Sequence, residues 1–198
     1  MSQPNLAAVG ESGLISADDV LFLRRTVFKD GVVSTAEIDA LFALAARAPK
    51  GDPQWPMFFE EAVADFFLRE EEPQGYLTSE EFGALKARIL GAPNALVLGM
   101  LVALTEKATK TPEEMSAYVA GEIKRAILSR PEGARVSKAD SALVARFIYA
   151  AGGDGNVSVT RAEAELLFDI NDATRGAGND PAWAELFVRG VAAHLMAH

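Results

Sequence analysis

An acidic segment at residues 70–81, EEEPQGYLTSEE, carries oxygen atoms at the spacing that a calcium ion requires. A twelve-residue calcium loop ligates the ion from positions 1, 3, 5, 7, 9 and 12 and has glycine at position 6. With Gly75 at position 6, the side chains at the ligand positions are those of Glu70, Glu72, Gln74, Thr78 and Glu81. Because glutamates replace the usual short aspartates and Pro73 interrupts the loop, an acidic linker before a capped helix is the favoured interpretation, and calcium binding is the alternative.

A second group of oxygen-bearing side chains lies in the glycine-rich segment at residues 152–158, GGDGNVS. Asp154, Asn156 and Ser158 stand at alternate positions, like the first three ligands of a calcium loop. Val159 then occupies the position at which such a loop needs glycine. The three residues are candidate metal ligands, but the pattern favours a flexible connection between two helices.

The segment at residues 26–37, TVFKDGVVSTAE, matches only the second half of a calcium loop. Asp30 and Glu37 fit ligand positions, with Gly31 at the glycine position. Thr26 and Phe28 fall where the first two ligands should be, and a phenylalanine ring cannot ligate a hard cation. We therefore predict that this segment connects one helix to the next and does not bind calcium.

Residue types that enzymes use for nucleophilic or metal-assisted catalysis are scarce in this sequence. There is no cysteine, and the two histidines, His194 and His198, lie four residues apart without the glutamate of a zinc-protease motif. No phosphate-binding loop, dinucleotide fingerprint or nucleophile elbow is present. We expect no catalytic residue, no enzyme activity and no cofactor other than the candidate calcium ion.

The elements that position these segments are predicted to be helices with a common start signal. Ser or Thr is followed three residues later by Asp or Glu, a capping box in which hydroxyl and carboxylate each accept an otherwise unpaired amide. The pattern occurs at Ser16/Asp19, Ser34/Glu37, Thr78/Glu81, Thr111/Glu114, Ser137/Asp140 and Thr160/Glu163. Further starts are indicated at Asp52-Pro53, Asn94 and Asp180-Pro181. Apolar residues recur at helical spacing between them, so the sequence predicts an all-α fold of about nine helices with no sheet.

The chain also contains an internal repeat. The aligned segments are 15–28 with 136–149, 33–42 with 159–168, and 52–67 with 180–195. Each copy is therefore predicted to be a unit of three helices. The expected organisation is a flexible N-terminus at 1–11, a first helical lobe at 12–90 and a second helical lobe at 91–198.

Composition and charge narrow the classes of partner. The net charge is −9, the pI is near 4.8 and no run of Lys or Arg is present, which disfavours nucleic acid as a partner. The most apolar stretch, residues 89–104, contains a proline and is shorter than the roughly 20 residues of a membrane-spanning helix, so a buried helix is predicted. The first residues lack a signal-peptide pattern. We expect a cytoplasmic protein, monomeric or homodimeric, that does not bind membranes.

The helix-loop-helix segments of the repeat resemble known families. Residues DGVVSTAEIDALF resemble a degenerate EF-hand, and the same pattern is similar to the TerB-like helical domains of tellurite resistance. The resemblance covers residues 20–45 and 144–170. It implies a compact helical unit with either an acidic metal-binding surface or a role in protein interaction, with Asp30 and Glu37, and more loosely Asp154 and Glu163, at the matching positions.

These observations favour a non-enzymatic helical protein that acts in protein-protein interaction or scaffolding. The alternative is a calcium sensor or buffer that uses a degenerate EF-hand-like loop. The interaction hypothesis predicts an exposed apolar patch larger than a few hundred Å² on the folded surface.

Overall fold

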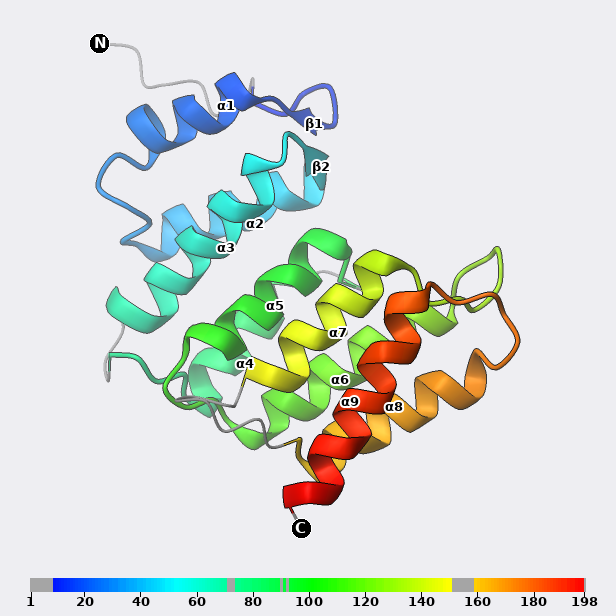
Figure 1. The fold of residues 1–198 in the computed structure, drawn as a ribbon. Helices are drawn as coiled ribbons and strands as arrows, with labels where there is room; N and C mark the ends of the chain where they lie inside the picture. The colour runs from blue at the N-terminus through cyan, green and yellow to red at the C-terminus, as the bar shows by residue number, and fades with distance from the viewer. Residues whose placement is uncertain (1–8, 71–73, 90, 92, 151–158, 198) are drawn as a thin grey trace. The chain divides into compact units, whose positions relative to one another are not determined.

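The computed structural model describes residues 9–70, 74–89, 91, 93–150 and 159–197. These residues form nine α-helices and two five-residue π-helical segments, so the predicted all-α class is confirmed. The chain divides into two compact units, residues 1–112 and 113–198, and each is described by itself (Figure 1).

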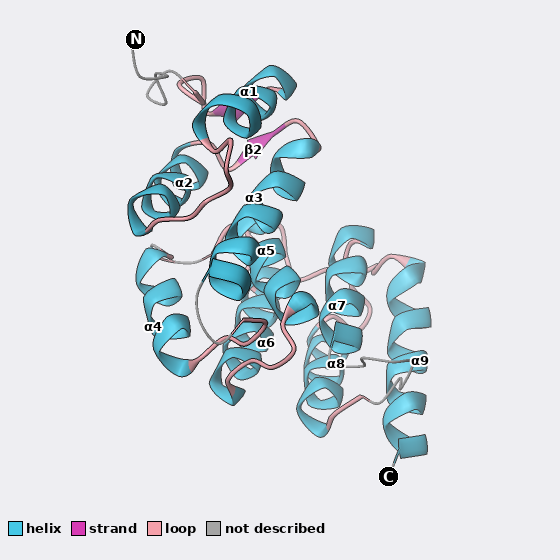
Figure 2. Cartoon of the chain, turned by 90° about the vertical axis from the view of Figure 1, so that its left-hand side faces the viewer, coloured by secondary structure: helices cyan, strands magenta, loops and turns pink. Residues whose placement is uncertain are grey.

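The first unit contains the first copy of the repeat followed by two more helices. Its elements are β1 (Leu14–Ile15), α1 (Ala17–Phe22), the π-helical segment η1 (Leu23–Val27), α2 (Thr35–Arg47), β2 (Lys50–Gly51), α3 (Gln54–Asp65), the π-helical segment η2 (Phe66–Glu70), α4 (Ser79–Arg88) and α5 (Ala95–Lys107). The second unit contains α6 (Glu113–Leu128), α7 (Lys138–Ala150), α8 (Arg161–Ala173) and α9 (Pro181–Ala197). In Figure 2, α8 and α9 lie with α7 in the second unit.

Four of the six predicted capping boxes are complete in the structure, at Ser16, Thr78, Ser137 and Thr160. At Ser16, Thr78 and Thr160 the hydroxyl accepts the amide three residues later, and that residue's carboxylate accepts the amide of the cap. Ser137 and Asp140 make the same two bonds before α7. Ser34 accepts the Glu37 amide, but the Glu37 carboxylate reaches the Val33 amide instead of that of the cap. At these five positions, Ser or Thr followed three residues later by Asp or Glu therefore marks the start of a helix.

The internal repeat is confirmed by matching hydrogen bonds in the two copies. The Asp52 amide donates to the Ile15 carbonyl at 2.7 Å, and the Asp180 amide donates to the Val136 carbonyl at 2.9 Å. Trp55 and Trp183, in the first turn of the third helix of each copy, are both buried. In both copies, the aspartate that precedes the third helix is therefore hydrogen-bonded to the residue just before the N-cap of the first helix.

The expectation of no sheet is corrected by a pair of very short strands. Residues 14–15 pair in parallel with residues 50–51. Gly51 makes the close approach possible, because a Cβ atom at this position would lie 2.3 Å from the Ile15 carbonyl oxygen. A two-residue strand is too short to show the alternation of apolar and polar residues that reveals longer strands.

The predicted boundary between lobes at 90/91 also differs from the structure, which divides the chain after residue 112. Helix α5 belongs to the first unit because it packs along α3. The approach is close at Gly99, where a Cβ atom would lie 2.9 Å from the Glu60 carboxylate. A helix that is apolar on all sides gives no sequence signal for the direction in which it packs.

The last residues of the expected flexible N-terminus are held in the fold. Val9 is buried, and its carbonyl accepts a 2.6 Å hydrogen bond from the Arg47 guanidinium. The predicted buried helix within residues 89–104 is confirmed, since residues 96–104 of α5 are all buried. In the described part of the chain, no helix combines the length and hydropathy needed to cross a membrane.

Candidate functional site

The candidate calcium loop at residues 70–81 is described except for residues 71–73, so Glu72 lies outside the described residues. Three of the described candidate ligands, Gln74, Thr78 and Glu81, are engaged in hydrogen bonds within the chain. The Glu81 carboxylate accepts the Thr78 hydroxyl at 2.7 Å and the Thr78 amide at 2.6 Å, and the Gln74 amide group donates to the Arg69 carbonyl. Thr78 and Glu81 therefore serve the start of α4, while Glu70 ends η2 on the surface.

The second candidate metal set, Asp154, Asn156 and Ser158, lies outside the described residues. Across the ranges that are described, no three or more His, Asp or Glu side chains cluster in a way that could hold a metal ion. Calcium binding by either loop stays a prediction.

The segment at residues 26–37 is a turn between η1 and α2. Phe28 is buried and packs on Phe58 at a ring-centroid distance of 6.1 Å. Gly31 has a φ of +88°, the left-handed conformation that glycine adopts without strain. Glu37 accepts the Ser34 hydroxyl at 2.8 Å. The side chains at the third and twelfth loop positions thus stabilise the fold.

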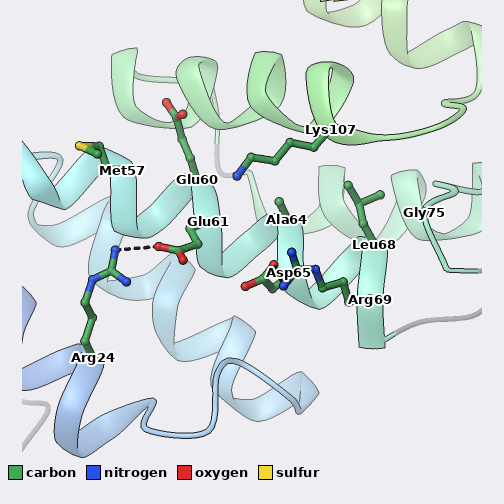
Figure 3. A pocket seen from close by; sticks show the side chains of 10 residues that line it. All are labelled: Arg24, Met57, Glu60, Glu61, Ala64, Asp65, Leu68, Arg69, Gly75 and Lys107. Carbon is green, nitrogen blue, oxygen red and sulfur yellow. Dashed lines mark hydrogen bonds and ion pairs between the residues drawn. The ribbon is translucent and has the colours of Figure 1, made fainter. Parts of the chain in front are cut away.

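An open groove of about 760 Å³ lies on the first unit between α3, η1, η2 and the end of α5 (Figure 3). Its charged lining alternates in sign: Arg24 pairs with Glu61 at 2.7 Å, and Arg69 pairs with Asp65 at 3.2 Å. Among the described residues that line the groove there is no histidine, serine or threonine.

The second unit has a charged network at the start of α7. The Asp140 carboxylate is nearly buried and receives two hydrogen bonds from the Arg130 guanidinium, at 2.8 and 2.5 Å, and one from the Ser137 amide at 2.7 Å. Burial alone would raise the pKa of Asp140, but the hydrogen bonds from Arg130 and Ser137 outweigh it and hold the pKa below its usual value. The network ties the loop before α7 to the helix.

Glu163, the carboxylate of the capping box of α8, behaves in the opposite way. Burial raises its pKa above the usual value, against the effect of hydrogen bonds from the Thr160 amide and hydroxyl. His194 lies on α9, and its Nδ1 is 2.8 Å from the Val159 carbonyl oxygen. Both residues have structural hydrogen bonds at the start of α8, which is the simplest account of their positions.

Exposed apolar side chains gather on α9. Val188, Leu195 and Met196 are exposed by 64, 71 and 82%. Together with their neighbours they form a stripe at positions i, i+1, i+4, i+5, i+8 and i+9 of one helix. We call this stripe the open face, and it consists of Phe187, Val188, Val191, Ala192, Leu195 and Met196. Large exposed apolar residues of the first unit are instead distributed over different elements: Leu14, Leu21, Val33, Met57 and Tyr76.

The repeat identifies the equivalent of the open face in the first copy. The aligned residues are Phe59, Glu60, Val63, Ala64, Phe67 and Leu68, on α3 and η2. Apart from Glu60, all of these are buried. Helix α5 packs along α3 and lies against this stripe at Glu60, which points toward α5 in Figure 3. The stripe that is buried in the first copy is therefore largely exposed in the second.

An aromatic pair extends the open face onto α8. Phe168 and Phe187 contact edge to face with ring centroids 5.3 Å apart, as Phe42 and Phe59 do at 5.4 Å in the first copy. The pair in the first copy is buried, whereas Phe168 is 46% exposed. Helices α8 and α9, orange and red in Figure 1, pack on each other. The apolar surface thus continues across two helices of the second unit.

In comparisons with known proteins, no family model, no curated protein and no solved structure matches this chain. The resemblance to EF-hand-like and TerB-like repeats therefore stays a prediction that rests on the loop residues.

The sequence carried a signal for the open face. Trp183, Leu186, Gly190 and Ala193 form the buried face of α9, and the open face adds a second apolar stripe to the same helix. A helix at the surface of a small domain needs only one apolar stripe. Helix α9 therefore carries more apolar surface than its packing within the second unit covers.

Proposed function

We propose that this chain is a non-catalytic interaction protein that binds a partner protein through the open face of α9. The exposed stripe supports this function, because soluble proteins rarely leave a contiguous apolar surface uncovered unless it is a contact site. The equivalent stripe is buried in the first copy. The same repeat therefore serves as core in one unit and as a contact surface in the other.

The network at Asp140 supports a structural role for the charged residues of the second unit. Arg130 and Asp140 satisfy each other, and neither lies on the open face. The open face itself carries no charged side chain, so desolvation of its residues on binding costs little and their transfer from water drives association.

Site-specific photo-crosslinking in the cells that produce the protein tests this function. A benzophenone side chain placed at Ala192, at the centre of the open face, should give a discrete adduct with another protein chain. The same side chain at Met57, exposed on α3 of the first unit, is the matched control. Equal labelling at both positions, or no adduct at Ala192, would contradict the proposed function.

A further inference from the structure

We infer that the open face binds a single helix of a partner protein, one with an uncharged apolar face, in the way that α3 binds α5. This inference rests on the proposed function and names the kind of partner. Its basis is the internal repeat, because two copies of one three-helix unit present the same face of their third helix. In the first copy α5 packs on α3 and meets that face at Glu60, beside Gly99 of α5.

The length of the open face fits one helix of moderate length. From Phe187 to Met196 it spans ten residues, which is about 15 Å at the α-helical rise of 1.5 Å per residue. The fully buried run of α5, Leu96 to Leu104, has a similar length. A partner segment of three helical turns would therefore cover the open face.

The chemistry of the two faces differs at one position, and that difference specifies the partner. Glu60 in the first copy corresponds to Val188 in the second, so the charged position beside Gly99 of α5 has become apolar. The next turn carries alanine in both copies, at Ala64 and Ala192, which allows close approach of the helix axes. The partner helix consequently needs no charge and no polar group at the crossing point.

The probe for this inference is the α5 segment of the chain itself. A synthetic peptide of residues 94–108, with lysines added at both ends for solubility and a fluorescent label, is titrated with the intact protein. Saturable one-to-one binding is expected, measured by fluorescence anisotropy. Val188→Glu and Leu195→Glu place a charge in the open face and should each weaken binding at least tenfold. Met57→Glu, an equally exposed change on α3, should leave the affinity unchanged.

Circular dichroism of each variant verifies that it is folded, which is expected since both substituted side chains are largely exposed. Failure of the wild-type protein to bind the peptide, or equal binding by Val188→Glu, would overturn the inference. So would a homodimer of the wild-type protein that Val188→Glu dissociates in analytical ultracentrifugation, because a second copy would then occupy the face. Crosslinking at Ala192 without peptide binding would leave the proposed function standing and remove only the helical partner.

Discussion

The third helices of the two copies, α3 and α9, have the same buried face and differ on the opposite one. Trp55 and Trp183 anchor them at equivalent positions, while the stripe beginning at Phe59 is covered and the stripe beginning at Phe187 is open. In the first unit the chain continues from η2 into α4 and α5, and α5 packs on α3. In the second unit α6 packs instead on α8. A duplicated sequence can therefore become core or contact surface according to what packs on it.

The largest expected difference between the copies is in the loss of stability when the phenylalanine of the third helix is replaced by alanine. Phe59 is fully buried between Phe42 and Trp55, so Phe59→Ala leaves a cavity and should lower the free energy of unfolding by about 3–5 kcal/mol. Phe187 is only partly buried, and Phe187→Ala should cost less than half as much.

Urea unfolding followed by tryptophan fluorescence measures both changes, because each unit contains one of the two tryptophans. Replacing Trp183 by phenylalanine leaves Trp55 as the reporter of the first unit, and the reverse replacement isolates the second. Equal losses for the two alanine variants would mean that Phe187 is covered in solution, and the contrast between the copies would fail.

The sequence predicts those features of the two copies that depend on residues close together in the chain or on direct alignment. The caps at Ser16 and Thr160 follow from two residues three apart, and the repeat follows from direct alignment. The sequence could not predict which stripe is covered, because Phe59 and Phe187 are both phenylalanine and only tertiary packing distinguishes the buried one from the partly exposed one. The pairing of residues 14–15 with 50–51 was likewise hidden, since its single local sign is a glycine at position 51.

In the candidate metal sites, too, the type of a residue does not by itself reveal its role. A glutamate such as Glu81 can serve as a calcium ligand or as part of a helix cap, so its type alone does not distinguish the two roles. In the structure its carboxylate accepts hydrogen bonds from the Thr78 amide and hydroxyl, as in a helix cap. The prediction for residues 26–37 has a different basis, because the phenylalanine ring of Phe28 cannot ligate a hard cation. The buried position of Phe28 agrees with that argument.

An intermediate effect is expected at the first helix of each copy. Asp140 is nearly buried and paired with Arg130, so Asp140→Ala leaves the guanidinium without its partner and should cost about 3 kcal/mol. Asp19, the aligned residue of the first copy, is only partly buried and its side chain bonds only Ser16 among the described residues, so Asp19→Ala should cost about 1 kcal/mol or less. Thermal and urea unfolding of both variants check the difference.

The contribution of Asp140 to the free energy of unfolding should also depend on pH. Its folded-state pKa is lowered, so its contribution is fully present above the unfolded-state pKa of about 3.9 and is lost as pH falls through the lower folded-state pKa. The stability difference between wild type and Asp140→Asn should therefore shrink below about pH 4. A difference that stays constant from pH 7 to pH 2 would show that the carboxylate charge contributes nothing.

The smallest expected difference concerns the two tryptophans. The Trp55 indole N–H donates to the Ala48 carbonyl at 3.1 Å, whereas the buried Trp183 indole N–H has no hydrogen-bond partner in the described structure. In the second copy Thr174 stands in place of Ala48, and its carbonyl and hydroxyl oxygens accept the Asn179 side-chain amide at 3.3 and 2.9 Å. The acceptor used in the first copy is thus engaged elsewhere in the second.

Trp55→Phe and Trp183→Phe remove the same ring volume, so their difference isolates the indole hydrogen bond. Trp55→Phe leaves the Ala48 carbonyl unsatisfied and should cost about 1–2 kcal/mol more than Trp183→Phe, which removes a donor that is already unsatisfied. Urea unfolding by far-UV circular dichroism is the measurement, since both variants lose a fluorophore. Asn179→Ala gives the matched control: it removes the two hydrogen bonds that the Asn179 side chain donates to the Thr174 oxygens, and if the indole of Trp183 then gains an acceptor, the cost of Trp183→Phe should rise in that background. A Trp183→Phe variant as destabilised as Trp55→Phe would show that the two indoles are bonded alike.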